Sequence, residues 1–359
     1  MDKKEEQFLY KLSNADGTSG HEGEIREIFK EEVKPYTSEV DFDGLGSVVA
    51  KYGQNGPRIL MASHMDEVGF MVTKITDEGF IEFQTIGGWW AQVMLAQQVT
   101  ITTRNGDKIL GVTGSKPPHV LSAEARNKVY DINDMFIDLG MSSKKEVENL
   151  GIRPGDMITP KIEARRMNGG KFLLGKAWDN RIGTAIVLKV LENLAKEENT
   201  TNQMFLGADV QEEVGLRGAQ TLTHMVNPDL SFAVDTGTAG DTPGMTAKEA
   251  DSILGKGPQI LIFDASMIPH QKLLNFVTDI ADELKIPYQL TVIAGGGTDA
   301  GKMHLSHNGV PSLAVTVPVR YLHSHTSIIH EDDYLNTVKL LTEVAKRLDD
   351  KTVAEIKAY

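Results

Sequence analysis

The sequence predicts an α/β fold in which a doubly wound, mostly parallel sheet flanked by helices is interrupted by a small β-rich insertion. After Gly175, apolar strand-like runs alternate with amphipathic helical segments, as they do in a doubly wound sheet. Between about residues 68 and 168, short β-rich runs are broken by Gly, Asn and Asp. The chain of 359 residues is long enough for two such domains.

The N-terminal segment also indicates α/β structure. Residues 22–34 carry apolar side chains at helical spacing. The stretch SEVDFDGLGSVVAKYG (38–53) predicts two strands around a glycine turn, and a short apolar strand over 59–62 leads to His64. We therefore expect this segment to belong to the same domain as the C-terminal half.

The middle segment has a different texture. RNGDK (104–108) predicts a hairpin turn, and SKKEVENLGI (143–152) predicts one short helix. We expect residues 68–168 to form an inserted β-rich dimerisation or assembly domain, and residues 1–67 and 169–359 to form one catalytic domain.

The C-terminal half supplies most of the predicted sheet and its helices. In chain order, the predicted elements are a helix over 179–199, a strand over 203–210, a helix over 217–226, a strand over 230–235, a helix over 270–285, a strand over 288–293, a helix over 297–309, a strand over 311–317 and a helix from about 331.

Composition excludes several classes of function. The chain has no cysteine, which rules out disulfides and thiol chemistry and leaves His, Asp and Glu as metal ligands. A net charge of −13 opposes nucleic-acid binding. No apolar run approaches the roughly 20 residues of a membrane span, and MDKKEEQFLYKLS has no apolar signal core. We expect a cytoplasmic protein that binds neither nucleic acid nor membrane.

Histidines and acids gather where predicted strands end. His64, Asp235 and His323 follow three strands, Glu212 and Glu213 follow a fourth, and Asp179 stands where a loop enters a helix. Each of these residues alone has a structural explanation, such as a hydrogen-bonded histidine, a helix cap or a turn. In an open α/β sheet, however, the carboxyl ends of the strands meet at one edge, where sites form. The coincidence therefore favours a site.

The chemistry of this set suits divalent metals. Imidazole and carboxylate bind zinc, cobalt or manganese, and two neighbouring cations need a bridging carboxylate, which Asp179 could supply. A two-metal site polarises a carbonyl and acidifies water, and it still needs a base. Adjacent residues of an extended chain point to opposite sides, so we expect one of Glu212 and Glu213 to face a metal and the other to face the water. Asp66 could hold the ring N–H of His64.

These residues lie in motifs that resemble the M42 family of metallo-aminopeptidases, of the glutamyl and tetrahedral aminopeptidase type. The matching stretches are SHMDEVGFMV, GKAWDNRIG, QEEVGLRGA, AVDTGTAGDTPG, GGGTDAG and VRYLHS, and the resemblance runs from about residue 8 to the end. It implies that His64 and Asp235 bind one metal, that Glu213 and His323 bind the other, and that Asp179 bridges both. It further implies that Glu212 is the general base and that Asp66 orients His64.

The resemblance also implies an architecture and partners. We expect a zinc-peptidase-like α/β domain, an inserted PDZ-like β domain used in assembly, and a homo-oligomer of dimers that build a dodecamer. The expected cofactors are two divalent ions per subunit, Zn²⁺ or Co²⁺, with Mn²⁺ also compatible. His325 and Gly237 depart from the family pattern beside the site, which puts the preferred N-terminal residue in doubt.

We therefore expect an aminopeptidase that releases N-terminal residues from short peptides, with Thr298, Asp299 and Arg320 as candidate substrate-lining residues. A helix N-cap equally explains the first two of these residues, and a structural ion pair could explain Arg320. A metal-dependent deacylase or other amidohydrolase on the same scaffold is one alternative function. A glycosidase fits poorly, because its carboxylates must face one bond about 5–10 Å apart. A non-catalytic assembly protein is the alternative from another class, and the presence of Glu212 and Asp179 argues against it.

Overall fold

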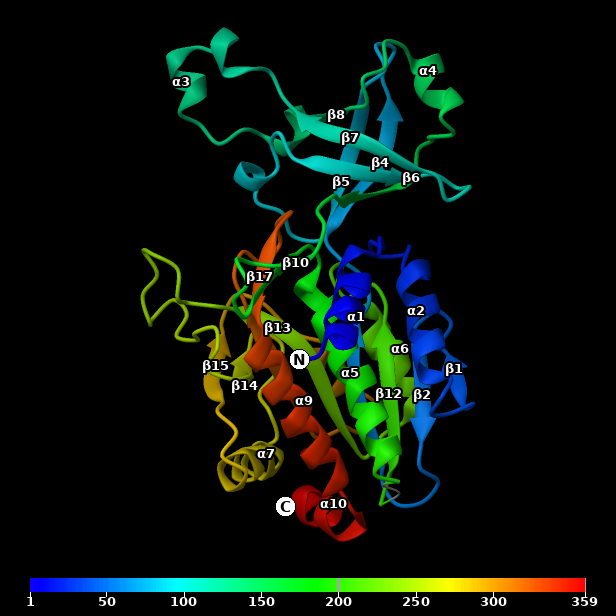
Figure 1. Ribbon diagram of the computed structural model, residues 1–359, viewed down its shortest axis with the longest axis vertical. Helices are drawn as coiled ribbons and strands as arrows, with labels where there is room; N and C mark the ends of the chain where they lie inside the picture. The colour runs from blue at the N-terminus through cyan, green and yellow to red at the C-terminus, as the bar shows by residue number, and fades with distance from the viewer. Residues whose placement is uncertain (199–200, 359) are drawn as a thin grey trace.

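The computed structural model describes residues 1–198 and 201–358 and is built on a mixed eight-stranded sheet (Figure 1). The strand order is β1-β2-β12-β3-β13-β16-β14-β15. Strands β12, β3, β13 and β16 run parallel to their neighbours among these four, whereas β2 is antiparallel to β12 and β14 is antiparallel to β16. The α/β class is thus confirmed, with a sheet that is mixed and parallel only in part. The strands are β1 Val40–Phe42, β2 Val48–Tyr52, β3 Arg58–His64, β12 Gln203–Asp209, β13 Leu230–Thr238, β14 Gln259–Asp264, β15 Gln289–Ile293 and β16 Ser312–Val319.

Helices cover both faces of the sheet because side chains alternate along the buried strands. On β3, Ile59 and Met61 face one apolar core, whereas Leu60 and Ala62 face the other. The first core packs against α1 Lys3–Asn14, α2 Gly23–Val33, α5 Trp178–Lys196, α7 Gln271–Glu283, α9 Glu331–Lys346 and α10 Asp350–Lys357. The second core packs against α6 Arg217–Val226 and α8 Ala300–Met303. Helix α5 is buried nearly all round, which fits its central place in Figure 1.

The middle segment forms a closed barrel of strands β4-β5-β8-β7-β6-β9, which stands at one end of the α/β layers (Figure 1). The hairpin predicted at RNGDK joins β6 to β7. The barrel has its own apolar core, which includes Phe70, Val99 and Ile137. Its strands are β4 Gly69–Ile75, β5 Ile81–Ile86, β6 Gln98–Thr102, β7 Lys108–Gly114, β8 Phe136–Asp138 and β9 Met157–Pro160, joined by η1 Ala91–Val93, η2 Pro118–Val120, α3 Ala123–Arg126, η3 Ile132–Asp134 and α4 Lys144–Asn149.

Several elements differ from the sequence prediction. The predicted helix over 297–309 shrinks to the four residues of α8, and beyond it His307 and Gly309 both have positive φ, which a continuous helix does not allow. Strand β14 and helix α1 were not predicted, nor was a small sheet of β10 Arg165–Arg166, β11 Phe172–Gly175 and β17 Ser327–His330. The predicted helix over 179–199 ends at Lys196, and residue 199 lies outside the described residues, as do 200 and 359 of the predicted catalytic domain. No helix in the described ranges is long and apolar enough to cross a membrane.

Candidate metal centre

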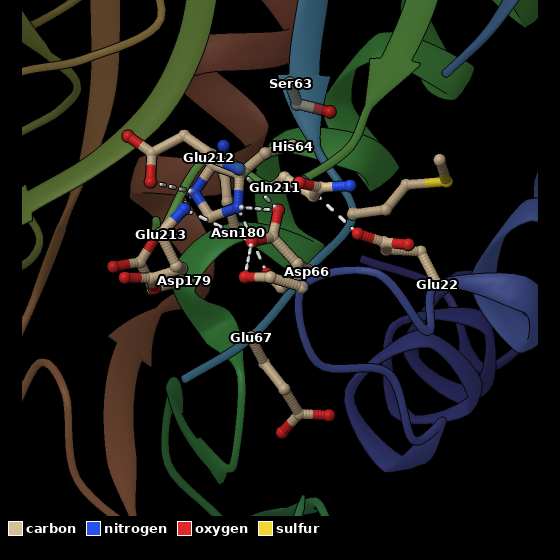
Figure 2. Close-up of polar contacts among 12 residues, drawn as sticks. Glu22, Ser63, His64, Asp66, Glu67, Asp179, Asn180, Gln211, Glu212 and Glu213 are labelled. Atoms are coloured by element: carbon tan, nitrogen blue, oxygen red, sulfur yellow. Dashed lines mark hydrogen bonds and ion pairs between the residues drawn. The ribbon is translucent and has the colours of Figure 1, made fainter. Parts of the chain in front are cut away.

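The predicted ligands meet at one edge of the sheet. His64 is the last residue of β3, Asp235 lies in β13, and His323 follows β16. Glu212 and Glu213 follow β12, and Asp179 stands in the non-helical first turn of α5, with ψ of 105°. Because β3, β12, β13 and β16 are parallel, their carboxyl ends bring these side chains together. Figure 2 shows His64, Asp179, Glu212 and Glu213 gathered around one centre.

Asp179 lies between two histidines. Its Oδ1 is 3.1 Å from His64 Nε2, and its Oδ2 is 3.4 Å from His323 Nε2. Asp235 Oδ1 is 3.6 Å from the same His64 nitrogen, and Glu213 Oε2 is 3.4 Å from the same His323 nitrogen. Among the described residues, three sets of possible ligand atoms result, and within each set the atoms lie within 4.8 Å of one another. Two of these sets share Asp179, one with His64 and Asp235 and the other with Glu213 and His323, whereas the third set joins His64, Glu212 and Glu213.

The two adjacent glutamates reach the centre from a turn. We expected them to continue the strand and to diverge by its two-residue alternation, but β12 ends at Asp209 and Gln211 adopts a left-handed conformation with φ of 57°. The alternation argument was therefore wrong, because the backbone is no longer extended. The carboxylates still face different histidines: Glu212 Oε2 lies 3.9 Å from His64 Nε2, whereas Glu213 approaches His323.

Asp66 fixes both His64 and this turn. Its buried carboxylate accepts hydrogen bonds from the backbone N–H groups of Glu212 and Glu213, at 3.0 and 3.1 Å, and from Ser19 Oγ at 2.6 Å. His64 Nδ1 lies 3.1 Å from the backbone oxygen of Asp66 and 3.5 Å from its Oδ1. These oxygens would hold a proton on Nδ1, and in that tautomer Nε2 could bind a metal.

The electrostatics of the cluster reflect crowded, buried acids. Burial raises the pKa of Glu213 to about 8 and raises those of Glu212 and Asp235, and repulsion between neighbouring acids adds to each rise. Burial opposes protonation of His323, but the hydrogen bond to Asp179 and the charge of Glu213 outweigh it and raise its pKa to about 9. The centre therefore contains more carboxylates than positively charged partners.

The residues present fit divalent cations. Glu213 Oε1 is buried and has no hydrogen-bond partner among the residues that the structure describes, although a buried carboxylate oxygen normally has one. Imidazole nitrogens and carboxylate oxygens, without thiolates, are ligands that zinc, cobalt and manganese share. Cations in the two ligand sets would relieve the repulsion among the acids.

A buried network of ion pairs contacts the segments that carry the candidate ligands. Arg181 is fully buried and donates to Glu67 and to backbone oxygens that include Met65 O, at 2.8 Å, next to His64 and Asp66 in the chain. Lys176 Nζ bonds Glu67 Oε1 and Asp16 Oδ1, each at 2.7 Å. Asp16 also accepts from two barrel residues, Lys108 Nζ at 2.6 Å and Thr159 Oγ at 2.7 Å. The network therefore joins the barrel to the segments that carry His64 and Asp179.

The centre opens into a cleft of about 810 Å³. Thr298 lines this cleft, and its Oγ donates to Asp264 at 2.8 Å. Asp299 is buried beside Asp209, and burial raises its pKa to about 7. Asp299 and Arg320 are not among the lining residues; both Arg320 Nε and Nη2 bond Asp241, at 2.8 and 2.6 Å. Of the three predicted substrate-lining residues, the structure places only Thr298 in the cleft wall.

Sequence reasoning missed Ser19 and Glu22. Glu22 is buried and accepts from the backbone N–H groups of Gly20 and Gln211; Figure 2 shows Glu22 and Gln211 near Asp66. The local signal in the sequence for Glu22 is an acid in the loop SGHE, just before a helix. A helix cap explains such an acid equally well, so the signal does not indicate a site. His304 and His307 lie outside the centre: His304 Nδ1 is 2.8 Å from Ala300 O, and the ring of His307 stacks on that of His224.

This α/β scaffold carries histidine and carboxylate groups that could hold metal ions, an arrangement that fits the class of metal-dependent hydrolases. The chain belongs to the M42 peptidase family: the family model described as M42 glutamyl aminopeptidase matches residues 46–340. It is 40% identical to glutamyl aminopeptidase from Lactococcus lactis subsp. cremoris (strain MG1363) over 352 residues, which is 97% of this chain and 98% of the relative.

Solved structures of TET peptidases superpose closely on this chain and support the family assignment. The TET aminopeptidase from the marine sediment archaeon Thaumarchaeota archaeon SCGC AB-539-E09 superposes with a TM-score of 0.96 at 42% identity and 99% coverage of both chains. The Pyrococcus horikoshii TET1 peptidase, described as able to assemble into a tetrahedron or a large octahedral shell, superposes with a TM-score of 0.86 at 33% identity, over 94% of this chain and 98% of that one. The chain is thus an enzyme of an aminopeptidase family.

Proposed function

We propose that this protein is a co-catalytic two-metal aminopeptidase that releases N-terminal residues from short peptides. The observation that carries the proposal is the position of Asp179, whose two oxygens face two separate sets of ligand atoms beside one open cleft. His64 and Asp235 would hold one ion, Glu213 and His323 the other, and Asp179 both. Zn²⁺ or Co²⁺ fits these ligands, and Mn²⁺ is compatible.

The division of labour follows from the contacts. When bound, the two cations would polarise the scissile carbonyl and acidify the attacking water. Glu212 is the acid of the turn that takes no part in either of the two sets that share Asp179, and it lies beside them in the cleft. Its carboxylate would take the proton from the water and return it to the leaving amine. Asp66 would hold His64 and the backbone of both glutamates in register.

Assembly belongs to the same proposal. We infer a homo-oligomer in which the barrel, within residues 68–168, acts as a PDZ-like assembly domain and dimers build a dodecamer. The support is the likeness to a peptidase that is described as assembling into closed shells. A separate apolar core gives the barrel the internal packing of an independent domain.

The test uses chelator-treated protein reloaded with Zn²⁺, Co²⁺ or Mn²⁺. We expect hydrolysis of aminoacyl chromogenic amides that carry a free amine, and none of their N-acetylated forms. The Glu212→Gln variant should retain metal and lose about 10²–10⁴-fold in kcat, whereas Glu163→Gln, an exposed glutamate outside the cleft, should retain activity. Hydrolysis of no free-amine amide under any metal would refute the function, and release of acetate from the acetylated forms would favour the deacylase alternative. Full activity of metal-loaded Glu212→Gln would refute the assignment of the base.

A further inference from the structure

The cleft continues beyond the metal centre into a compartment that can hold a side chain. Its walls come from the end of β13, the end of β15 with the glycine-rich segment that follows, and the segment that contains Glu249 and Ala250. An aminopeptidase must place the N-terminal residue of its substrate next to the metals. If the proposed function holds, this compartment receives the side chain of that residue.

The compartment contains one charge. Among the described residues that line the cleft, Glu249 is the only charged side chain outside the metal cluster, and no Lys or Arg lines it. Arg320, the nearest arginine to His323 in the sequence, is held by Asp241, and Lys248 is exposed and is not a lining residue. The carboxylate of Glu249 accepts from Thr246, which lowers its pKa and keeps it ionised.

Two neutral polar side chains of the wall, Gln259 and Thr291, are already hydrogen-bonded, whereas Thr236 Oγ has no hydrogen-bond partner among the described residues. Gln259 is buried, its Nε2 donates to Ser252 Oγ at 2.6 Å, and its Oε1 accepts from Thr316 Oγ at 2.8 Å. Thr291 Oγ donates to Asp251 at 3.1 Å, so a second acid stands behind this wall. Among the described residues of this wall, a substrate carboxylate would meet no cationic side chain and would face the carboxylate of Glu249.

The remaining lining suits a long aliphatic stem. Leu216, Ile293 and Leu322 line the cleft, and half-exposed Val292 adds apolar surface. Lysine and arginine bury such stems against apolar walls while their charged ends reach a polar group. The metal centre does not reverse this preference for a basic side chain. The charge of two divalent cations would be balanced by its four carboxylates, those of Asp179, Glu212, Glu213 and Asp235.

We propose that the compartment selects substrates with a basic N-terminal residue, lysine or arginine, and disfavours acidic ones, with Glu249 as the specificity-determining residue. This inference rests on the proposed aminopeptidase function. The proposed preference for a basic residue differs from the glutamyl activity for which the Lactococcus lactis relative is named, although 40% of the aligned residues are identical.

The test compares kcat/KM for Lys-, Arg-, Leu- and Glu-chromogenic amides with the metal-loaded protein. An exposed ion pair changes an equilibrium by up to about fivefold, so opposite effects on lysine and glutamate give a Lys/Glu ratio of about tenfold or more. Glu249→Gln should lower the Lys/Leu ratio of kcat/KM about fivefold. Glu249→Lys should raise the Glu/Leu ratio, and Lys248→Gln, the neighbouring control, should change neither.

The outcomes separate the two proposals. If Leu-amide is cleaved but the Lys/Glu ratio is near one or below it, or if Glu249→Gln leaves the Lys/Leu ratio unchanged, the specificity is refuted and the aminopeptidase function stands. If no amide is cleaved under any metal, both fail. Free L-lysine should also raise the Tm of the metal-loaded protein more than L-glutamate at equal concentration, and the reverse order would count against a basic compartment.

Discussion

Ser19→Ala should weaken the metal centre without touching a ligand. Ser19 Oγ donates to Asp66 Oδ2 at 2.6 Å, and both side chains are buried. It is one of three hydrogen bonds that reach this carboxylate, the others coming from the backbone N–H groups of Glu212 and Glu213. Loss of the Ser19 hydrogen bond leaves the Asp66 carboxylate less well fixed. The same carboxylate orients His64 and the backbone of Glu212 and Glu213, so the metal ligands lose part of their support.

The magnitude follows from the type of bond. A hydrogen bond to a charged group contributes about 1.5–3 kcal/mol, and mutation of such a supporting partner typically costs 10–100-fold in metal affinity or activity. Two hydrogen bonds to Asp66 survive, so we expect the lower end, about tenfold in metal affinity.

The assay is competition for Zn²⁺ or Co²⁺ against a chromogenic chelator, with kcat/KM measured at saturating metal. Ser63→Ala is the matched control, because Ser63 is buried next to His64 but contacts Thr184 at 3.1 Å and not Asp66. Metal affinity of Ser19→Ala within twofold of the parent protein, or an equal loss in Ser63→Ala, would refute the supporting role of the hydrogen bond between Ser19 and Asp66.

Three further predictions concern charge. Glu213→Gln should reduce the metal retained after dialysis from two ions to one per subunit, measured by mass spectrometry, because one of the two ligand sets loses an anion. Arg320→Gln should leave the Lys/Glu ratio of substrate hydrolysis unchanged, because its guanidinium bonds Asp241 and does not line the cleft. Asp16→Asn should lower the Tm at pH 7, since removal of one member of a buried ion pair costs about 3–5 kcal/mol. Burial opposes ionisation of Asp16, but Lys176 and Lys108 outweigh it and hold its pKa well below the usual range. The folded pKa is therefore below the unfolded value of about 3.9, so the stabilisation exists above about pH 4 and fades as pH falls further; the Tm gap should narrow accordingly.

Each of these predictions has a contrary result. If Glu213→Gln retained two ions per subunit, the second metal site would have to lie elsewhere. A Lys/Glu ratio that changes severalfold in Arg320→Gln would return that residue to the substrate pocket. A Tm gap that widens as the solution is acidified would contradict the ionised state of Asp16.

The strand-end residues were predictable because their signal is local. His64 closes an apolar run and Asp235 follows one, and the parallel arrangement of β3 and β13 then brings them together. Asp179 was found by its place at the start of α5, where an acid is common for capping alone. What remained open was whether these segments converge, and the distances of 3.1 to 3.9 Å around His64 Nε2 answer that.

The rest depended on tertiary packing that no local pattern encodes. Ser19 reaches Asp66 because the N-terminal loop pairs with the chain at Thr18 and Glu67, far away in sequence. Arg320 stands next to a strand end, as the ligands do, yet its partner Asp241 lies in a distant loop that draws it away from the cleft. The direction of a side chain at a strand exit is set by the turn that follows, and the sequence alone does not specify that turn.

The position of Asp16 limits how far this protein can be reduced in size. A catalytic fragment made by excising the barrel would lose Lys108 and Thr159 and leave Asp16 with only Lys176 among its three side-chain donors. Lys176 stands three residues before Asp179, so the damage would reach the presentation of the shared carboxylate. A minimal enzyme would therefore need compensating substitutions at Asp16, and grafting the α/β part onto another assembly module would require that module to supply the missing donors.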